Sequence, residues 1–199
     1  MTLKEIDKLF IDLDSKNDKI RYPAFLKLME ITNKKVKWIY DKWYVLYEKL
    51  SSENSFVRNI GLILLANLAK SDYENRLEKI IDEYLEFFED EKFVTSRLCI
   101  QNVWRIAVAD KRLKGKIIGK LEESYFENAF LKIHPNLIRL DIISSLMKIY
   151  NTTKEQKTFD LIQTLINEET DLKSKKAMEK TVVEQNNKAK TERRMAYQK

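Results

Sequence analysis

Five aromatic residues crowd into a ten-residue stretch of this 199-residue chain, where their rings could stack on a ligand: Trp38, Tyr40, Trp43, Tyr44 and Tyr47. At helical spacing, Trp43 falls on an apolar face, the three tyrosines form a second stripe and Trp38 points elsewhere. One apolar face does not require so many rings, and the extra rings could form an exposed surface for a peptide, a small ligand or a base. The alternative is that other helices cover the rings. Trp38 and the three tyrosines are therefore candidate partner-binding residues.

Charged residues form two opposite runs in the middle of the chain. Residues 72–91 hold nine acidic and two basic residues, whereas residues 111–120 hold no acid and five bases: Lys111, Arg112, Lys114, Lys116 and Lys120. The two runs could attract each other and otherwise face water. They could instead form a groove with an acidic and a basic side that selects a protein partner of matching charge. The five bases are therefore candidate partner contacts.

The net charge of +6 comes mainly from residues 170–199, which hold nine bases and four acids. We expect this segment to be a basic C-terminal helix or tail whose first part closes the preceding repeat. Its later bases could contact phosphate or an acidic partner: Lys188, Lys190, Arg193 and Arg194. Four bases without further support are a nonspecific indication of nucleic-acid binding.

Residue types that commonly carry catalysis or bind metal are scarce. Cys99 is the single cysteine and His134 the single histidine. We expect Cys99 to be a buried apolar residue in a reducing compartment and His134 to be a solvated or capping side chain. We therefore predict no catalytic residue, no metal and no cofactor. The longest apolar run, residues 60–66, is far shorter than the ~20 residues of a membrane span, so a cytoplasmic protein without a membrane segment is expected.

The elements that must position these residues follow from a repeated phrase. An arginine recurs at intervals of about 40 residues, with apolar or small residues three, seven and ten places later: Arg21, Arg58, Arg97 and Arg139. The residues seven places later are Leu28, Leu65, Trp104 and Leu146. These offsets share one face of a helix, so the phrase predicts a buried column. Small residues three places after the arginine, such as Gly61, predict close helix packing, and Asp18, Ser55 and Asn136 are the expected N-caps.

A second amphipathic stretch follows each phrase, so each copy is predicted to be a helix hairpin. The predicted copies span residues 18–52, 55–90, 92–127 and 134–169, preceded by a helix that caps the first copy. The repeat domain is thus expected over residues 1–169. One hairpin cannot bury its apolar side alone, so the copies must stack.

The pattern resembles HEAT and armadillo-type repeats through Ile20-Arg21, Val57-Arg58 and Ile138-Arg139, each followed three places later by a small or apolar residue. The resemblance implies an all-α fold, a right-handed α–α superhelix of about four helix hairpins with N- and C-terminal capping helices. In such repeats the arginine usually pairs with a carboxylate of an adjacent unit. The motif is informative about fold and says little about function.

Two functions fit the sequence. The first is a non-enzymatic scaffold that binds a protein partner through its concave surface. The second is a nucleic-acid-binding protein or an enzyme similar to the HEAT-like alkylpurine DNA glycosylases, in which a catalytic Asp follows a Trp by one helical turn. Here the residues four places after the three tryptophans are Lys42, Tyr47 and Val108, which favours the scaffold. The sequence indicates neither the oligomeric state nor the binding face.

Overall fold

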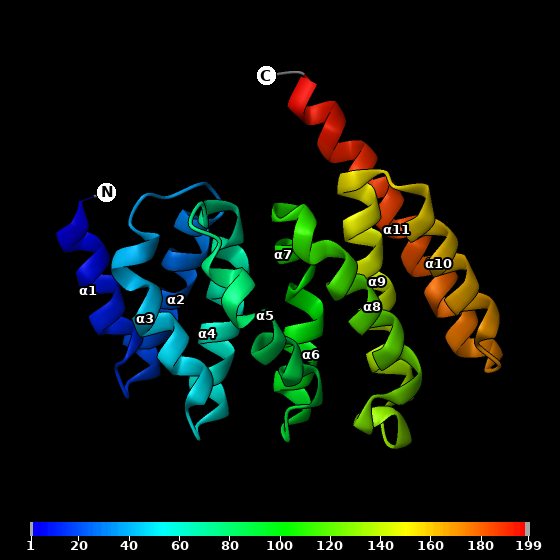
Figure 1. Ribbon diagram of the computed structural model, residues 1–199, viewed down its shortest axis with the longest axis horizontal. Helices are drawn as coiled ribbons and strands as arrows, with labels where there is room; N and C mark the ends of the chain where they lie inside the picture. The colour runs from blue at the N-terminus through cyan, green and yellow to red at the C-terminus, as the bar shows by residue number, and fades with distance from the viewer. Residues whose placement is uncertain (1, 198–199) are drawn as a thin grey trace. The chain divides into compact units, whose positions relative to one another are not determined.

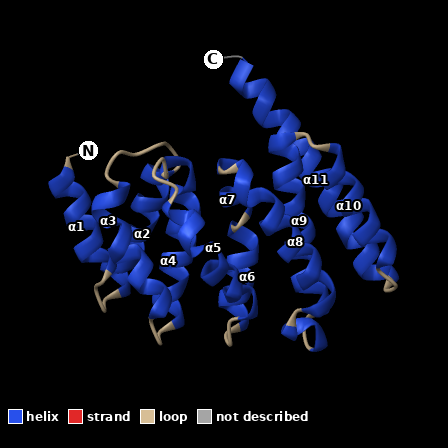
Figure 2. Cartoon of the chain, viewed as in Figure 1, coloured by secondary structure: helices blue, strands red, loops and turns tan. Residues whose placement is uncertain are grey.

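The chain folds into helices joined by short loops, with no strand in the part that the structure describes (Figure 2). The structure is a computed structural model that describes residues 2–197, without the side chains of residues 192, 193, 196 and 197. The predicted all-helical class is confirmed. Over these residues, none of the helices offers the length of apolar sequence that a bilayer crossing requires. The chain divides into two compact units, residues 1–79 and 80–199.

The first unit is built on α4, against which α2, α3 and η1 pack, while α1 packs on α2. Its helices are α1 (Leu3–Leu13), α2 (Asp18–Thr32), α3 (Ile39–Glu48), η1 (Lys49–Ser51), α4 (Ser55–Leu68) and η2 (Ala69–Ser71). The start of α5 (Arg76–Glu86) also belongs to this unit. Leu28 and Leu65 are fully buried, so the predicted columns do form its core.

The second unit is built on α9, which contacts α6, α7, α8, α10 and α11. After the rest of α5 come η3 (Phe87–Glu89), α6 (Phe93–Asn102), α7 (Trp104–Ala109), α8 (Lys111–Glu127), η4 (Ala129–Lys132), α9 (Pro135–Thr153), α10 (Gln156–Glu168) and α11 (Leu172–Tyr197). Figure 1 shows α10 and α11 together on one side of α9. Leu146 is fully buried in α9.

The residues that cap or interrupt the helices differ from those predicted at several helix ends. The N-caps of α2 and α4 are Asn17 and Asn54, one residue earlier than predicted, and each side chain accepts a hydrogen bond from the backbone N–H two residues on. Asn136 is not a cap, because α9 already begins at Pro135. The third phrase is broken by a turn at Val103, which separates α6 from α7. Trp104 therefore begins a new helix and is only half-buried, unlike the three leucines of its column.

The four repeat arginines do not share one role. Arg97 Nε lies 2.6 Å from Asp141, a carboxylate one copy further along, as the repeat resemblance implies. Arg21 instead pairs with Asp18 in its own helix, and Arg58 donates to the backbone carbonyls of residues 52 and 53. Arg139 pairs with Glu169 at 2.9 Å, just before α11. The expected pairing with an adjacent copy therefore holds for Arg97 and is wrong for Arg21.

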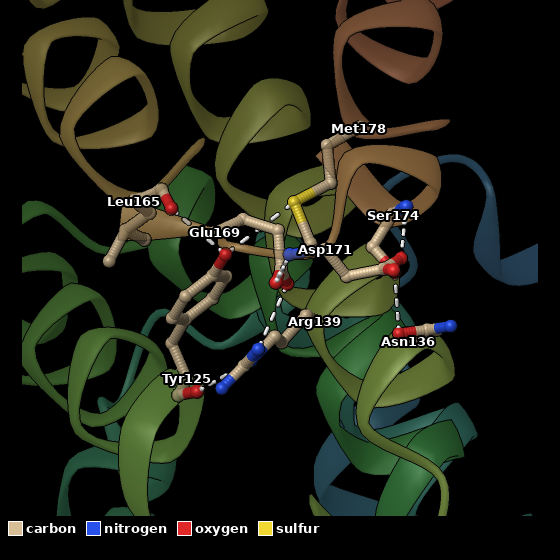
Figure 3. A network of polar contacts seen from close by, with 8 residues as sticks. All are labelled: Tyr125, Asn136, Arg139, Leu165, Glu169, Asp171, Ser174 and Met178. Atoms are coloured by element: carbon tan, nitrogen blue, oxygen red, sulfur yellow. Dashed lines mark hydrogen bonds and ion pairs between the residues drawn. The ribbon is translucent and has the colours of Figure 1, made fainter. Parts of the chain in front are cut away.

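A buried polar network fixes the start of α11 against α8 and α9 (Figure 3). The Tyr125 hydroxyl donates to the Leu165 carbonyl at 2.9 Å, and the Glu169 carboxylate, which is almost fully buried, accepts from Arg139. The Ser174 hydroxyl lies 2.6 Å from Asn136 Oδ1 on α9. Since Tyr125, Glu169 and Ser174 are buried, these hydrogen bonds favour one position for the start of α11. That position determines where the basic residues later in α11 come to lie.

Candidate functional site

The predicted aromatic surface is divided between covered and exposed rings. Trp38 precedes α3 and is half-buried, with its ring edge-to-face on Phe10 of α1 at 5.9 Å between centroids. Trp43 is buried in the core of the first unit, and Tyr47 is half-buried. Tyr44, by contrast, is 66% exposed. The N-terminal helix therefore covers part of Trp38, as the first alternative predicts for covered rings, whereas the ring of Tyr44 is exposed.

Tyr40 ties α3 to the beginning of α5. Its hydroxyl donates to Asp72 Oδ1 at 2.9 Å and accepts from the backbone N–H of Glu74. Burial, with the hydrogen bond to Asp72 added, raises the pKa of Tyr40 to about 12, so the phenol is neutral at physiological pH. The same Asp72 carboxylate accepts from the backbone N–H groups of Arg76 and Leu77 and so satisfies the first turn of α5.

Arg76 lies at the centre of the exposed rings. Its guanidinium carbon is 4.4 Å from the centroid of the Tyr40 ring and 5.7 Å from that of Tyr44. Tyr73, 71% exposed, packs edge-to-face on the Tyr40 ring at 4.7 Å. Arg76 Nε donates to Glu74 at 2.9 Å, whereas its buried Nη1 has no hydrogen-bond partner among the described groups. The faces of the rings take the place of an oxygen acceptor there.

We call these residues the Tyr44–Arg76–Tyr73 surface. Charges of both signs surround it. On α3, Asp41 and Glu48 are exposed one turn before and after Tyr44, whereas Lys35 and Lys37 are exposed in the loop that leads into α3. The surface therefore combines aromatic faces and a guanidinium with a rim of mixed charge, which is the composition of a protein-binding hot spot rather than of a continuous basic track.

The predicted basic residues of 111–120 lie on α8, and four of the five pair with an acid. Arg112 pairs with Asp110 at 2.6 Å, Lys116 with Asp82 at 2.6 Å and Lys120 with Glu123 at 2.7 Å, and Lys114 pairs with Glu155. Lys111 is exposed. Only the Lys116–Asp82 pair joins the acidic run to the basic run, and the other three acids lie outside residues 72–91. The four pairs leave little unbalanced charge on these residues for a partner.

The predicted tail residues belong to α11. Lys188, Lys190 and Arg194 are exposed on this helix, and the side chain of Arg193 lies outside the described residues. In Figure 1 the last turns of α11 extend past the end of α9. Lys188 lies where the two helices still meet, whereas Lys190 and Arg194 come later along α11.

The single cysteine and the single histidine both contact other residues of the fold. Cys99 is fully buried and contacts the Tyr84 carbonyl, and burial raises the pKa of its thiol well above the ordinary value. His134 does not cap α9 with its side chain but stacks on Phe93 at 4.3 Å between ring centroids. Among the described side chains, no group of three or more His, Cys, Asp or Glu residues is placed to hold a metal ion.

No protein-family model, curated protein or solved structure matches this chain. The site must therefore be argued from its own residues. Tyr73 and Arg76 are members that the sequence pattern did not reveal, because both lie within the acidic run of residues 72–91, whose net charge is its most visible property. The sequence does show that both residues come shortly after the polar Ser71-Asp72 joint, at or just before the start of the helix that contacts the aromatic stretch.

Proposed function

We propose that this chain is a non-enzymatic helical-repeat scaffold that binds a protein partner through the Tyr44–Arg76–Tyr73 surface. The two-helix copies at intervals of about 40 residues support a right-handed α–α superhelix of the HEAT type, with capping helices at both ends. In such a superhelix the second helix of each copy commonly lines the concave side. Tyr44 lies on the second helix of its copy, and Tyr73 and Arg76 lie at the start of the next copy's second helix. A single buried cysteine is consistent with a cytoplasmic location.

One observation carries the proposal: Arg76 lies over the Tyr40 ring and near the exposed Tyr44, the exposed Tyr73 packs on the same Tyr40 ring, and Arg76 is held by an ion pair with Glu74. Tyrosine and arginine dominate the energetics of protein interfaces because they bury a large area and lose little side-chain freedom on binding. Here that freedom is restricted before a partner arrives, which lowers the entropy cost of association. The rim of mixed charge favours a protein over a nucleic acid, whose phosphates would be repelled by Asp41 and Glu48.

The test compares the full chain with a Tyr44→Ala/Tyr73→Ala double variant. Each is used to recover proteins from the native cell, with and without nuclease, and the recovered partner is then purified and titrated directly. We expect a partner that survives nuclease treatment and binds the double variant about 10- to 100-fold more weakly, as for hot-spot tyrosines. Tyr22→Ala is the matched control, because Tyr22 is 60% exposed but lies on α2, the first helix of its copy.

Both substituted tyrosines of the test are exposed, so the melting midpoint should not change and lost binding cannot be attributed to unfolding. Two results would defeat the proposal. One is a partner whose recovery disappears on nuclease treatment, which would favour the nucleic-acid alternative. The other is equal loss of affinity in Tyr22→Ala, which would show that the partner binds elsewhere on the first unit.

A further inference from the structure

A small hollow lies within the second unit where three helices meet. Its volume is about 160 Å³, and its lining comes from Trp104 at the start of α7, from Lys148, Asn151 and Thr152 near the end of α9, and from Gln185 and Lys188 on α11. Pockets for whole small molecules usually measure ~300–1,000 Å³. This hollow, which we call the Trp104 pocket, is therefore sized for one chemical group rather than for a nucleotide or an organic cofactor.

Two lysines line the pocket, and Arg105 lies beside its tryptophan ring without lining it. The Arg105 guanidinium carbon lies 4.7 Å from the centroid of the Trp104 ring, and Lys148 Nζ lies 5.7 Å from it. Lys188 reaches the same hollow from α11. Burial is the largest influence on Lys148 and lowers its pKa, and the charges of Arg105 and Lys188 lower it further. The pocket thus concentrates positive charge in partly desolvated surroundings.

Among the described side chains, the two lysines of the pocket differ from the bases of α8, four of which pair with acids. Asp141 is the acid that favours the charged form of Lys148, but its carboxylate is already held by Arg97 at 2.6 Å and by Gln101 at 2.8 Å. Of the carboxylates that the structure describes, none forms an ion pair with Lys148 or Lys188. Two lysines held near each other and beside an arginine repel, so an anion that joins them relieves a cost already present in the fold.

The pocket is held in place by contacts that do not involve its cations. Asn151 Nδ2 donates to the Gln185 carbonyl at 3.2 Å, and Gln185 Nε2 donates to the Ser144 hydroxyl at 3.2 Å. The buried network at the start of α11 fixes the same helix at its other end (Figure 3). These contacts hold the part of α11 that carries Lys188 beside the part of α9 that carries Lys148. The Trp104 indole N–H is buried and lacks a hydrogen-bond partner among the described groups.

We propose that the Trp104 pocket binds a phosphate monoester group. A phosphate monoester carries a charge of about −1.5 to −2 at pH 7 and three strongly accepting oxygens, which match the two lysines of the pocket, the neighbouring charge of Arg105 and the indole N–H of Trp104. A phosphodiester backbone carries one charge per nucleotide and needs cations spread along a track. The bases of α8 cannot supply such a track because four of them pair with acids. The site lies in the second unit and is independent of the partner surface proposed for the first.

The test titrates the full-length chain with inorganic phosphate, and then with a peptide carrying phosphoserine, while chloride keeps the ionic strength constant. The three tryptophans give separate indole N–H signals in an NMR spectrum, and Trp104→Phe assigns the signal of the pocket. We expect that signal to shift saturably with phosphate. Lys148→Gln and Lys188→Gln should each weaken binding at least tenfold, whereas Lys148→Arg should retain it. The control is Lys132→Gln, an exposed lysine before the opposite end of α9.

The outcomes separate the sources of the phosphate. Tighter binding of the phosphopeptide than of inorganic phosphate assigns the site to a phosphorylated protein, and equal binding assigns it to a free phosphate compound; both support the pocket. Binding should also raise the melting midpoint of the wild-type chain and not that of Lys148→Gln. Any one of three results would overturn the proposal. The first is an equal shift of the Trp104 signal with chloride alone, and the second is unchanged phosphate affinity in both glutamine variants. The third is a DNA duplex that shifts the Trp104 signal while phosphate does not.

Discussion

Gly61 offers a quantitative test of how the first unit positions its exposed tyrosines. The residue lies inside α4, where glycine costs about 1 kcal/mol relative to alanine. The structure shows the compensation: a Cβ atom added to Gly61 would lie 3.0 Å from the Leu46 carbonyl oxygen, 3.0 Å from Lys49 Cβ and 3.1 Å from Leu50 Cδ2. Two of these three atoms belong to the backbone or are bonded directly to it, so they cannot turn away. The helix that carries Tyr44 rests on this contact.

The expected effect of Gly61→Ala is the difference of two terms. Overpacking a well-filled contact costs about 1–3 kcal/mol, and the better helix propensity of alanine returns about 1 kcal/mol. We therefore expect a net loss of about 0–2 kcal/mol in the free energy of unfolding. Gly115→Ala on α8 isolates the propensity term, because nothing lies within 4 Å of a Cβ added there, and it should stabilise the chain by about 1 kcal/mol. The gap between the two variants should be about 1–3 kcal/mol.

Urea unfolding followed by tryptophan fluorescence measures this gap. Trp38 and Trp43 report on the first unit, which holds Gly61, and Trp104 reports on the second, which holds Gly115. Gly61→Ala is therefore measured in a Trp104→Phe background, and Gly115→Ala from the Trp104 signal that remains when the signal of that background is subtracted. The slope with denaturant should stay constant, which shows that only stability has changed. If Gly61→Ala proved as stable as Gly115→Ala, the close approach of α4 to α3 and η1 would be wrong, and with it the placement of Tyr44.

Two further predictions concern the network of Figure 3. Glu169→Gln should lower the free energy of unfolding in the urea assay by about 1–3 kcal/mol. This is less than the ~3–5 kcal/mol for breaking a fully buried pair, because the Arg139 side chain is 25% exposed. Unchanged stability would contradict the pairing of Arg139 with Glu169. Burial, followed by the charge of Glu169, raises the pKa of Tyr125 to about 12. The unfolded chain releases this proton near pH 10, so stability should fall from pH 10 to pH 12. Tyr125→Phe should reduce the amplitude of the late step in phenolate absorbance, which Tyr40 shares.

The helical class, the buried columns and the close approach at Gly61 could be predicted because each depends on spacing within one helix. Leu28, Leu65 and Leu146 have the same offset from their arginines and are all fully buried. Trp104 has that offset too, but the turn at Val103 begins a new helix and leaves its ring half-buried. No composition signal at Val103 indicates this break, since the segment around it is as apolar as the other copies.

The candidate sites were harder to predict because their members come from different copies. Tyr40 and Arg76 meet only when the start of α5 packs on α3, and the acidic run around Arg76 conceals its stacking. The bases of α8 are the opposite case. They form an obvious run in the sequence, yet the fold provides Asp82 and Glu155 from other helices as partners. A charge run shows where charge lies along the chain, and only packing decides whether that charge is balanced.

A sequence separation of about 40 residues recurs in the contacts of the second unit. Hydrogen bonds there join residues at separations of 40, 41 and 44 positions. Trp104, Lys148 and Lys188 have nearly this spacing and line one pocket where α7, α9 and α11 meet. Other lysines share the separation without lining the pocket, such as Lys114 and Lys154. The spacing therefore narrows the choice of residues, and only the packing of the three helices decides which of them meet.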